Sequence, residues 1–123
     1  SAPTTLAALA ARIKTLLGLE AVRLAGRPDL PVRRVAVCSG SGSGLLPAFW
    51  QSTAEAFVSG DLRYHDAREA ELRDRGLIDI GHYESEVLVL ESLAQDLAAR
   101  LARTGDAVEV RVSRAEMPPF TIV

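Results

Sequence analysis

VRRVAVCSGSGSG, residues 32–44, is the stretch of this sequence that most directly predicts the fold. Its first part, Val32–Cys38, is a short apolar run that predicts a strand. The glycines and serines from Ser39 to Gly44 end that run. The next residues, Leu45–Ala54, have helical character, with Pro47 in the first turn where proline is tolerated. The stretch therefore predicts a strand, a glycine-rich turn and a helix.

The same succession occurs twice more along the chain. Ala56–Gly60 is a short apolar strand ahead of a predicted helix at Tyr64–Gly76, and Leu77–Gly81 precedes the longest predicted helix, Ser85–Arg103. Strands that alternate with helices predict a layered α/β/α domain with a mostly parallel or mixed sheet. Further elements bring the sheet to about five strands. These are a helix at Leu6–Leu17 and strands at Ala21–Ala25 and Ala107–Val112.

The composition bounds the class of protein. The chain has 123 residues, 48% of them hydrophobic, which suits one compact domain over residues 1–123. The net charge of −2 gives no sign of a protein held on nucleic acid by phosphate contacts. The single cysteine, Cys38, excludes an intrachain disulfide and favours the cytoplasm. No apolar run approaches the roughly 20 residues that span a membrane.

The candidate functional residues lie where the three strands end, at positions that we call the strand exits. Ligands of parallel sheets gather at these carboxyl ends. At the first exit, Ser39, Gly40, Ser41 and Gly42 precede a helix. Glycine lets the backbone approach a ligand, and successive amide groups ahead of a helix can cradle an anion. The spacing matches neither the dinucleotide fingerprint nor the P-loop. A tight turn with serines that cap the next helix is an equal interpretation.

The second exit brings Asp61, His65 and Asp66 together in sequence. His65 could serve as a metal ligand, as an acid or base, or as an ordinary residue of the helix start. An aspartate in the first turn of a helix is favourable for the helix dipole alone. From the local sequence, the structural interpretation is favoured here.

At the third exit, IDIGHYESE, His82 follows the strand and Glu86 comes four residues later. Neutral imidazole and carboxylate suit Zn, Mn, Fe or Ni, and the pair could form two legs of a metal site. Two ligands do not by themselves fix a metal. The alternative is that Glu86 complements the helix dipole while His82 hydrogen-bonds to its neighbours.

Taken in order, VRRVAVCSGSGS, SGDLRYHDA and IDIGHYESE resemble the GTP cyclohydrolase I type 2 homologues, also called NIF-three-like proteins. The resemblance covers residues from about Leu6 to Leu101. It implies a longer cytoplasmic α/β protein, assembled as a hexameric ring around a cavity that a two-metal site faces. This chain then corresponds to the carboxy-terminal half of a two-part protein.

The resemblance also assigns roles to residues. It implies that His82 and Glu86 are metal ligands, that His65 is a catalytic or substrate-side residue, and that Ser39–Gly42 can hold an anion. The family's paired histidines and a further acidic ligand belong to the other half. We therefore expect a partial site in this chain, with weak or absent binding of the two divalent metals.

Two functions follow as expectations from the resemblance. The first is a dinuclear-metal hydrolase that acts on a nucleotide-like or phosphorylated small molecule. The second is a non-catalytic scaffold that contains metal, or a regulatory module that binds a partner. Both predict a homo-oligomer with a small-molecule ligand as a possible partner, and neither predicts a membrane or a nucleic acid.

Overall fold

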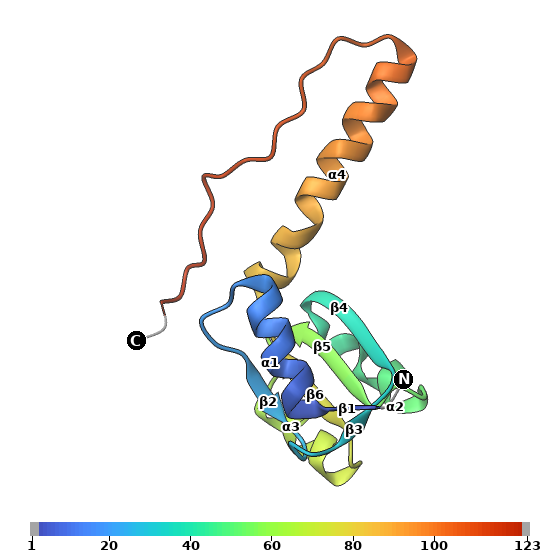
Figure 1. The fold of residues 1–123 in the computed structure, drawn as a ribbon, viewed down its shortest axis with the longest axis vertical. Helices are drawn as coiled ribbons and strands as arrows, with labels where there is room; N and C mark the ends of the chain where they lie inside the picture. Colours follow the sequence, from blue (N-terminus) through green and yellow to red (C-terminus); the bar gives the residue numbers. More distant parts are fainter. Residues whose placement is uncertain (1–2, 122–123) are drawn as a thin grey trace.

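Three parallel strands and one antiparallel strand form the main sheet of the computed structural model, which describes residues 3–121 (Figure 1). Parallel pairing joins β4 to β5 and β5 to β6, whereas β2 is antiparallel to β6, so the order across the sheet is β2-β6-β5-β4. The strands are β2 (Arg23–Ala25), β4 (Val35–Ser41), β5 (Ala56–Gly60) and β6 (Gly76–Asp79). The predicted mixed α/β fold is confirmed.

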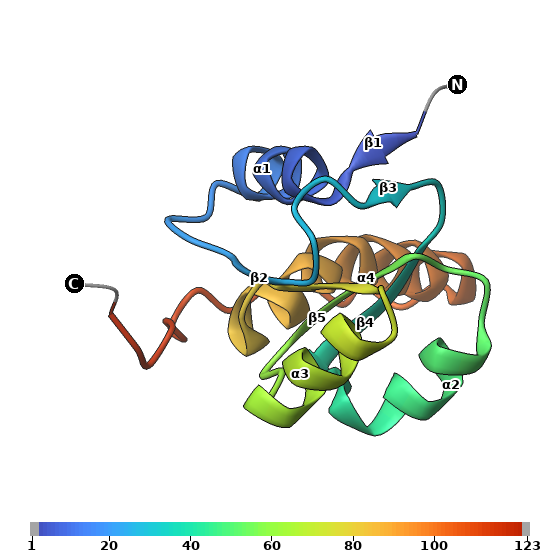
Figure 2. The same cartoon turned by 90° about the horizontal axis from the view of Figure 1, so that it is seen from below.

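The helices cover both faces of this sheet. Figure 2 shows α1 on one side of the sheet and α2 with α3 on the other, which is the predicted layering. A two-stranded antiparallel sheet, β1 with β3, lies beside α1. The elements are β1 (Thr4–Thr5), α1 (Leu6–Leu17), β3 (Pro31–Val32), the 3₁₀ turn η1 (Gly42–Leu45), α2 (Leu46–Gln51), α3 (Tyr64–Leu72) and α4 (His82–Thr104).

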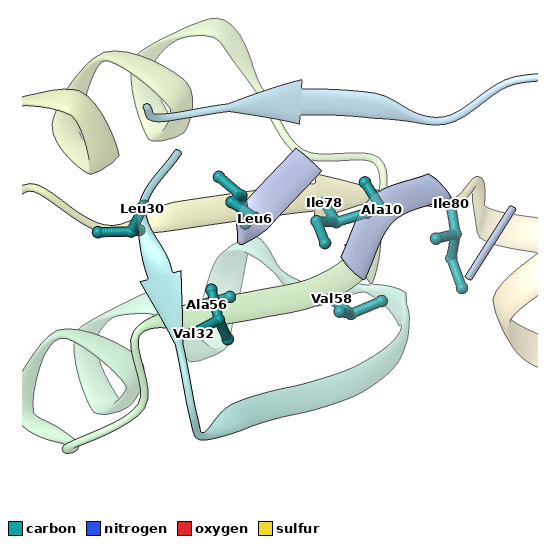
Figure 3. Packing of buried hydrophobic residues seen from close by; sticks show 8 residues of the cluster. All are labelled: Leu6, Ala10, Leu30, Val32, Ala56, Val58, Ile78 and Ile80. Carbon is teal, nitrogen blue, oxygen red and sulfur yellow. The ribbon is translucent and has the colours of Figure 1, made fainter. Parts of the chain in front are cut away.

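The two-residue period of the strands divides the core into two clusters. One face of β5 and β6 turns Val58 and Ile78 toward Leu6 of α1 (Figure 3). The opposite face turns Phe57 and Leu77 toward α2 and α3. Leu6 and Ile78 are fully buried. Burial of a side chain of this size stabilises the fold by about 1.5–3 kcal/mol.

The predicted strand at Ala107–Val112 is wrong. Helix α4 extends away from the sheet, and the chain that follows it runs back beside it without regular structure (Figure 1). A strand needs a neighbour to pair with its backbone groups, and alternating valines cannot supply one. Within residues 3–121, no strand pairs with this segment, so the main sheet has four strands rather than five.

Two boundaries near the predicted site also differ from expectation. The glycine–serine run Ser39–Ser41 belongs to β4 and does not end it, although the pairing with β5 shifts register between Val37 and Ser41. Helix α4 begins at His82, three residues earlier than predicted. His82 is thus the first residue of a helix rather than part of a loop. Over residues 3–121, no helix is both long and apolar enough to cross a membrane.

Candidate metal centre

Two strand exits meet at the carboxyl edge of the sheet. Parallel pairing of β5 with β6 places Ser59 opposite Asp79, so the residues that follow these strands emerge side by side. Asp61 follows β5 and His82 follows β6. The Asp61 Oδ2 and His82 Nδ1 atoms are 2.7 Å apart. The sequence grouped Asp61 with His65 and Asp66, whereas the structure pairs it with His82.

The buried carboxylate of Asp79 holds both exits in place. Its Oδ2 accepts a hydrogen bond from the Leu62 amide and its Oδ1 accepts one from the Gly81 amide, each at 3.0 Å. Arg23 of the antiparallel strand pairs with the same carboxylate. One buried side chain therefore fixes the backbone next to Asp61 and the backbone next to His82.

His82 and Glu86 lie on one face of the first turns of α4, because residues four apart are neighbours on a helix. The His82 Nε2 and Glu86 Oε1 atoms are 3.3 Å apart. Two ligands that bind one tetrahedral ion at about 2.0–2.2 Å would be separated by roughly 3.4 Å. The two donor atoms are therefore spaced as ligands of a common ion would be.

Glu84 takes the place that the helix-dipole interpretation gave to Glu86. Its carboxylate folds back against Gly81, the residue at the N-terminus of α4. A negative charge there complements the partial positive charge of the helix end. Glu86 lies two residues further along, on another face of the helix, and contacts His82 instead.

Gly40 brings backbone directly beside this pair. Its amide donates to the Ser85 hydroxyl at 2.7 Å, and that hydroxyl donates to the His82 carbonyl at 2.7 Å. A Cβ built on Gly40 would lie 2.5 Å from Glu86 Oε1 and 3.4 Å from His82 Nε2. Its φ of +63° also belongs to the left-handed region that favours glycine. Only glycine fits this position without displacing the pair.

The same contacts change the anion prediction for the glycine–serine run. The Gly40 amide is engaged by Ser85, so it is not free to donate to an anion. Gly42 is buried, and its Cα packs against the Ser59 side chain. Ser39 and Ser41 are exposed. Anion binding stays a prediction for this run, whereas Gly40 packs against the His82–Glu86 pair.

The charges around His82 favour its protonated form. The hydrogen bond with the Asp61 carboxylate raises the pKa of the His82 imidazole above its ordinary value of 6.5. Partial desolvation opposes this shift, and the negative charge of Glu86 adds to it. Because only a neutral imidazole can bind a metal ion, a metal at this residue would compete with the proton as the pH falls through that raised pKa.

At the second exit, Asp66 has a structural role and His65 is exposed. Asp66 is buried and accepts hydrogen bonds from the Ser43 hydroxyl at 2.6 Å and the Arg63 amide at 2.9 Å, so it ties the start of α3 to η1. This agrees with its interpretation as a helix-start residue. His65 is exposed in the first turn of α3, with its ring edge-on to Tyr64. Its catalytic role stays a prediction.

His82 and Glu86 are two candidate donors, fewer than a metal ion needs from a protein. Within residues 3–121, no three or more His, Cys, Asp or Glu side chains are grouped so that they could hold a metal ion. Asp61 does not complete the set, because it contacts Nδ1 while Glu86 lies beside Nε2. The two donors fit one ion, and any further ligands must come from other residues.

The fold and this arrangement define a class: a mixed α/β protein with a histidine–carboxylate pair at the carboxyl edge of its sheet. Comparison with known proteins identifies the family. The profile of the family described as Duf34/NIF3 (NGG1p interacting factor 3) matches residues 1–119. The chain belongs to this family.

Relatives share both sequence and structure with the chain. Proteins named GTP cyclohydrolase 1 type 2 homolog are 35% identical to it over 119 residues in Staphylococcus aureus (strain MSSA476) and over 107 residues in Staphylococcus epidermidis. These matches cover 97% and 87% of the chain, but only 32% and 29% of the relatives. The chain thus spans about a third of their length.

Solved structures give the same result for the fold. The crystal structure of Staphylococcus aureus protein SA1388 superposes with a TM-score of 0.88 at 33% identity, covering 98% of this chain and 39% of that one. A Bacillus cereus protein related to NIF3 also superposes with a TM-score of 0.88, at 28% identity over 98% of this chain and 33% of that one. The α/β architecture is therefore that of the family.

Proposed function

We propose that this chain contributes His82 and Glu86 as ligands to a divalent-metal centre, and that the protein is a metal-dependent hydrolase of nucleotide-like or phosphorylated small molecules. The observation that supports this proposal is the 3.3 Å separation of His82 Nε2 and Glu86 Oε1 at the carboxyl edge of the sheet. Ligands of α/β proteins bind at this edge. The name of the relatives, GTP cyclohydrolase 1 type 2 homolog, is compatible with a substrate of this class.

Each residue of the centre has a distinct task. His82 and Glu86 would hold Zn, Mn, Fe or Ni, since imidazole and carboxylate suit all four. Gly40 lets the backbone pass beside them, where a Cβ would collide with Glu86. When bound, a divalent ion in such a site supplies an acidified water for hydrolysis. His65 is the chain's other histidine and the candidate for proton transfer or substrate contact.

The length of the relatives indicates where the remaining metal ligands would lie. Because the chain spans about a third of them, the remaining ligands of a two-metal site would come from residues outside this segment. A homo-oligomeric ring, a cytoplasmic location and a small-molecule ligand are part of the same proposal. In that context this α/β segment is the carboxy-terminal part of a longer protein.

The ligand assignment is tested by removing each histidine in turn. In the longer protein, which would supply the remaining ligands, equilibrium dialysis against Zn²⁺ or Mn²⁺ followed by elemental analysis measures the metal bound per chain. His82→Ala should lose metal, whereas His65→Ala, the matched control, should retain it. Circular dichroism checks that both variants fold. Full metal content in the folded His82→Ala protein would refute the assignment.

A partner-binding module is the second candidate, because the family description names an interacting factor. In this alternative the metal is structural and the protein acts through a partner. A turnover screen of metal-loaded protein against nucleotides and phosphoesters separates the two functions. Hydrolysis that disappears in His82→Ala favours the enzyme. Stable metal binding without turnover of any phosphoester favours the module.

A further inference from the structure

Asp61 occupies an unusual backbone conformation for a residue other than glycine. Its φ is +51°, in the left-handed region that aspartate and asparagine tolerate better than most side chains. The neighbouring Leu62 amide is held by the buried Asp79 carboxylate, which keeps the exit loop in this conformation. The backbone of the adjoining exit is packed closely as well: a Cβ on Gly60 would come 2.5 Å from the Gly81 carbonyl oxygen.

This conformation directs the Asp61 carboxylate onto one nitrogen of the His82 ring. The Oδ2 to Nδ1 distance of 2.7 Å is that of a strong charge-assisted hydrogen bond. The contact on the other nitrogen, Nε2 to Glu86, is longer at 3.3 Å. Asp61 itself is 60% exposed, and within the described chain its carboxylate hydrogen-bonds to His82 alone. The fold therefore gains little from this carboxylate apart from the orientation of the ring.

We infer that Asp61 is the positioning residue of the metal centre. A neutral imidazole carries a single proton, and the nitrogen with the better acceptor keeps it. The Asp61 carboxylate therefore places that proton on Nδ1 and leaves the Nε2 lone pair directed toward Glu86. Metal-binding histidines in proteins are oriented in this way by a carboxylate on the second nitrogen. The inference rests on the proposed function for its metal, but the ring orientation is a property of this chain alone.

The structure provides a matched control for testing this role. Asp74 has the same φ of +51° and pairs with Arg27, on a different loop. Glycine accepts this backbone conformation without strain, so Asp61→Gly and Asp74→Gly each remove a carboxylate and an equal backbone constraint. Asp61→Asn is the conservative variant, because its amide oxygen can still accept a hydrogen bond from Nδ1.

The first measurement needs no metal. Long-range ¹H–¹⁵N spectra at a pH above the His82 pKa distinguish the two tautomers, and His65→Gln assigns the signals because the chain has only two histidines. We expect the Nδ1–H tautomer in the wild type and in Asp74→Gly. Asp61→Gly should shift to the Nε2–H tautomer, and Asp61→Asn should lie between. A wild-type ring protonated on Nε2 would overturn the inference.

The second measurement is a Zn²⁺ titration of the longer protein, which would supply the remaining ligands, with the bound metal measured by equilibrium dialysis. Loss of an orienting carboxylate typically weakens metal binding by about 10- to 100-fold. Asp61→Gly should show a loss in this range, while Asp74→Gly should bind as the wild type does. Equal affinities for all three proteins would refute the positioning role. An Asp61-dependent tautomer in a protein that binds no Zn²⁺ would instead sustain that role and refute the proposed metal centre.

Discussion

Replacement of Gly40 by alanine should damage the proposed metal centre more than it damages the fold. Gly40 has φ +63°, and its added Cβ would lie 2.5 Å from Glu86 Oε1. Gly18, at the end of α1, has nearly the same φ of +65°, but a Cβ added there would have nothing within 4 Å. Gly18→Ala therefore imposes the same backbone cost without the contact and serves as the control.

The expected magnitudes follow from these two positions. A left-handed conformation costs an alanine about 1–2 kcal/mol relative to glycine. For a chain of this size, each kcal/mol lowers the melting temperature by roughly 3–6 °C. Both variants should show this loss. In Gly40→Ala the Glu86 carboxylate, which is 57% exposed, must also move by about 1 Å to reach van der Waals distance. The carboxylate can move at little further cost in stability, but metal ligands tolerate only about 0.2 Å.

Thermal unfolding of the two variants in this chain, and Zn²⁺ titration of the same variants in the longer protein, separate these effects. Gly18→Ala should lose stability and keep the wild-type Zn²⁺ affinity. Gly40→Ala should lose a similar amount of stability and, in addition, most of its affinity. If Gly40→Ala binds Zn²⁺ as Gly18→Ala does, Glu86 is not a ligand and the reasoning fails. A much larger loss of stability in Gly40→Ala would show that Glu86 cannot move aside.

Three further predictions concern the surroundings of the centre. Ser85→Ala leaves the buried Gly40 amide without its acceptor, and denaturant unfolding should show a loss of about 1–3 kcal/mol. Burial acts to raise the pKa of Asp66, but hydrogen bonds from neighbouring groups outweigh it and leave the pKa below its ordinary value. The stability that the Asp66 carboxylate provides is therefore present at neutral pH and lost as the pH falls through its folded pKa. In Asp66→Asn, the free energy of unfolding should depend less on pH in the acidic range. An unchanged dependence would contradict this. An NMR titration should give His82 a pKa above the ordinary 6.5, and Asp61→Gly should lower that pKa. Equal pKa values in the two proteins would exclude Asp61 as the main cause of the raised pKa.

The order of strands and helices could be predicted from sequence because it depends on local patterns. Apolar runs at Ala56–Gly60 and Leu77–Gly81 are strands in the structure, with β6 shifted by a residue or two. The helix at Leu6–Leu17 begins and ends where its threonine cap and Gly18 predict. Such signals act between residues a few positions apart, so they survive in any tertiary context.

The strand predicted at Ala107–Val112 shows where local patterns fail. Its valines alternate as in a half-buried strand, but pairing depends on a second strand that sequence periodicity does not specify. The extension of β4 through Ser41 has a related cause. Glycine and serine are typical of turns, yet here the Gly40 amide is held by Ser85, 45 residues further along.

By itself, the sequence determined that Glu86 follows His82 by four residues, and the two share a helix face only because α4 begins at His82 rather than at Ser85 in the structure. It also placed them after a strand, where an α/β sheet binds its ligands. Only the tertiary structure decided that Asp61, 21 residues away, contacts the second nitrogen of His82. It also decided that Gly40 lies against Glu86. These contacts depend on which strands pair in parallel and on how the buried Asp79 joins the two exits, and no local spacing encodes either.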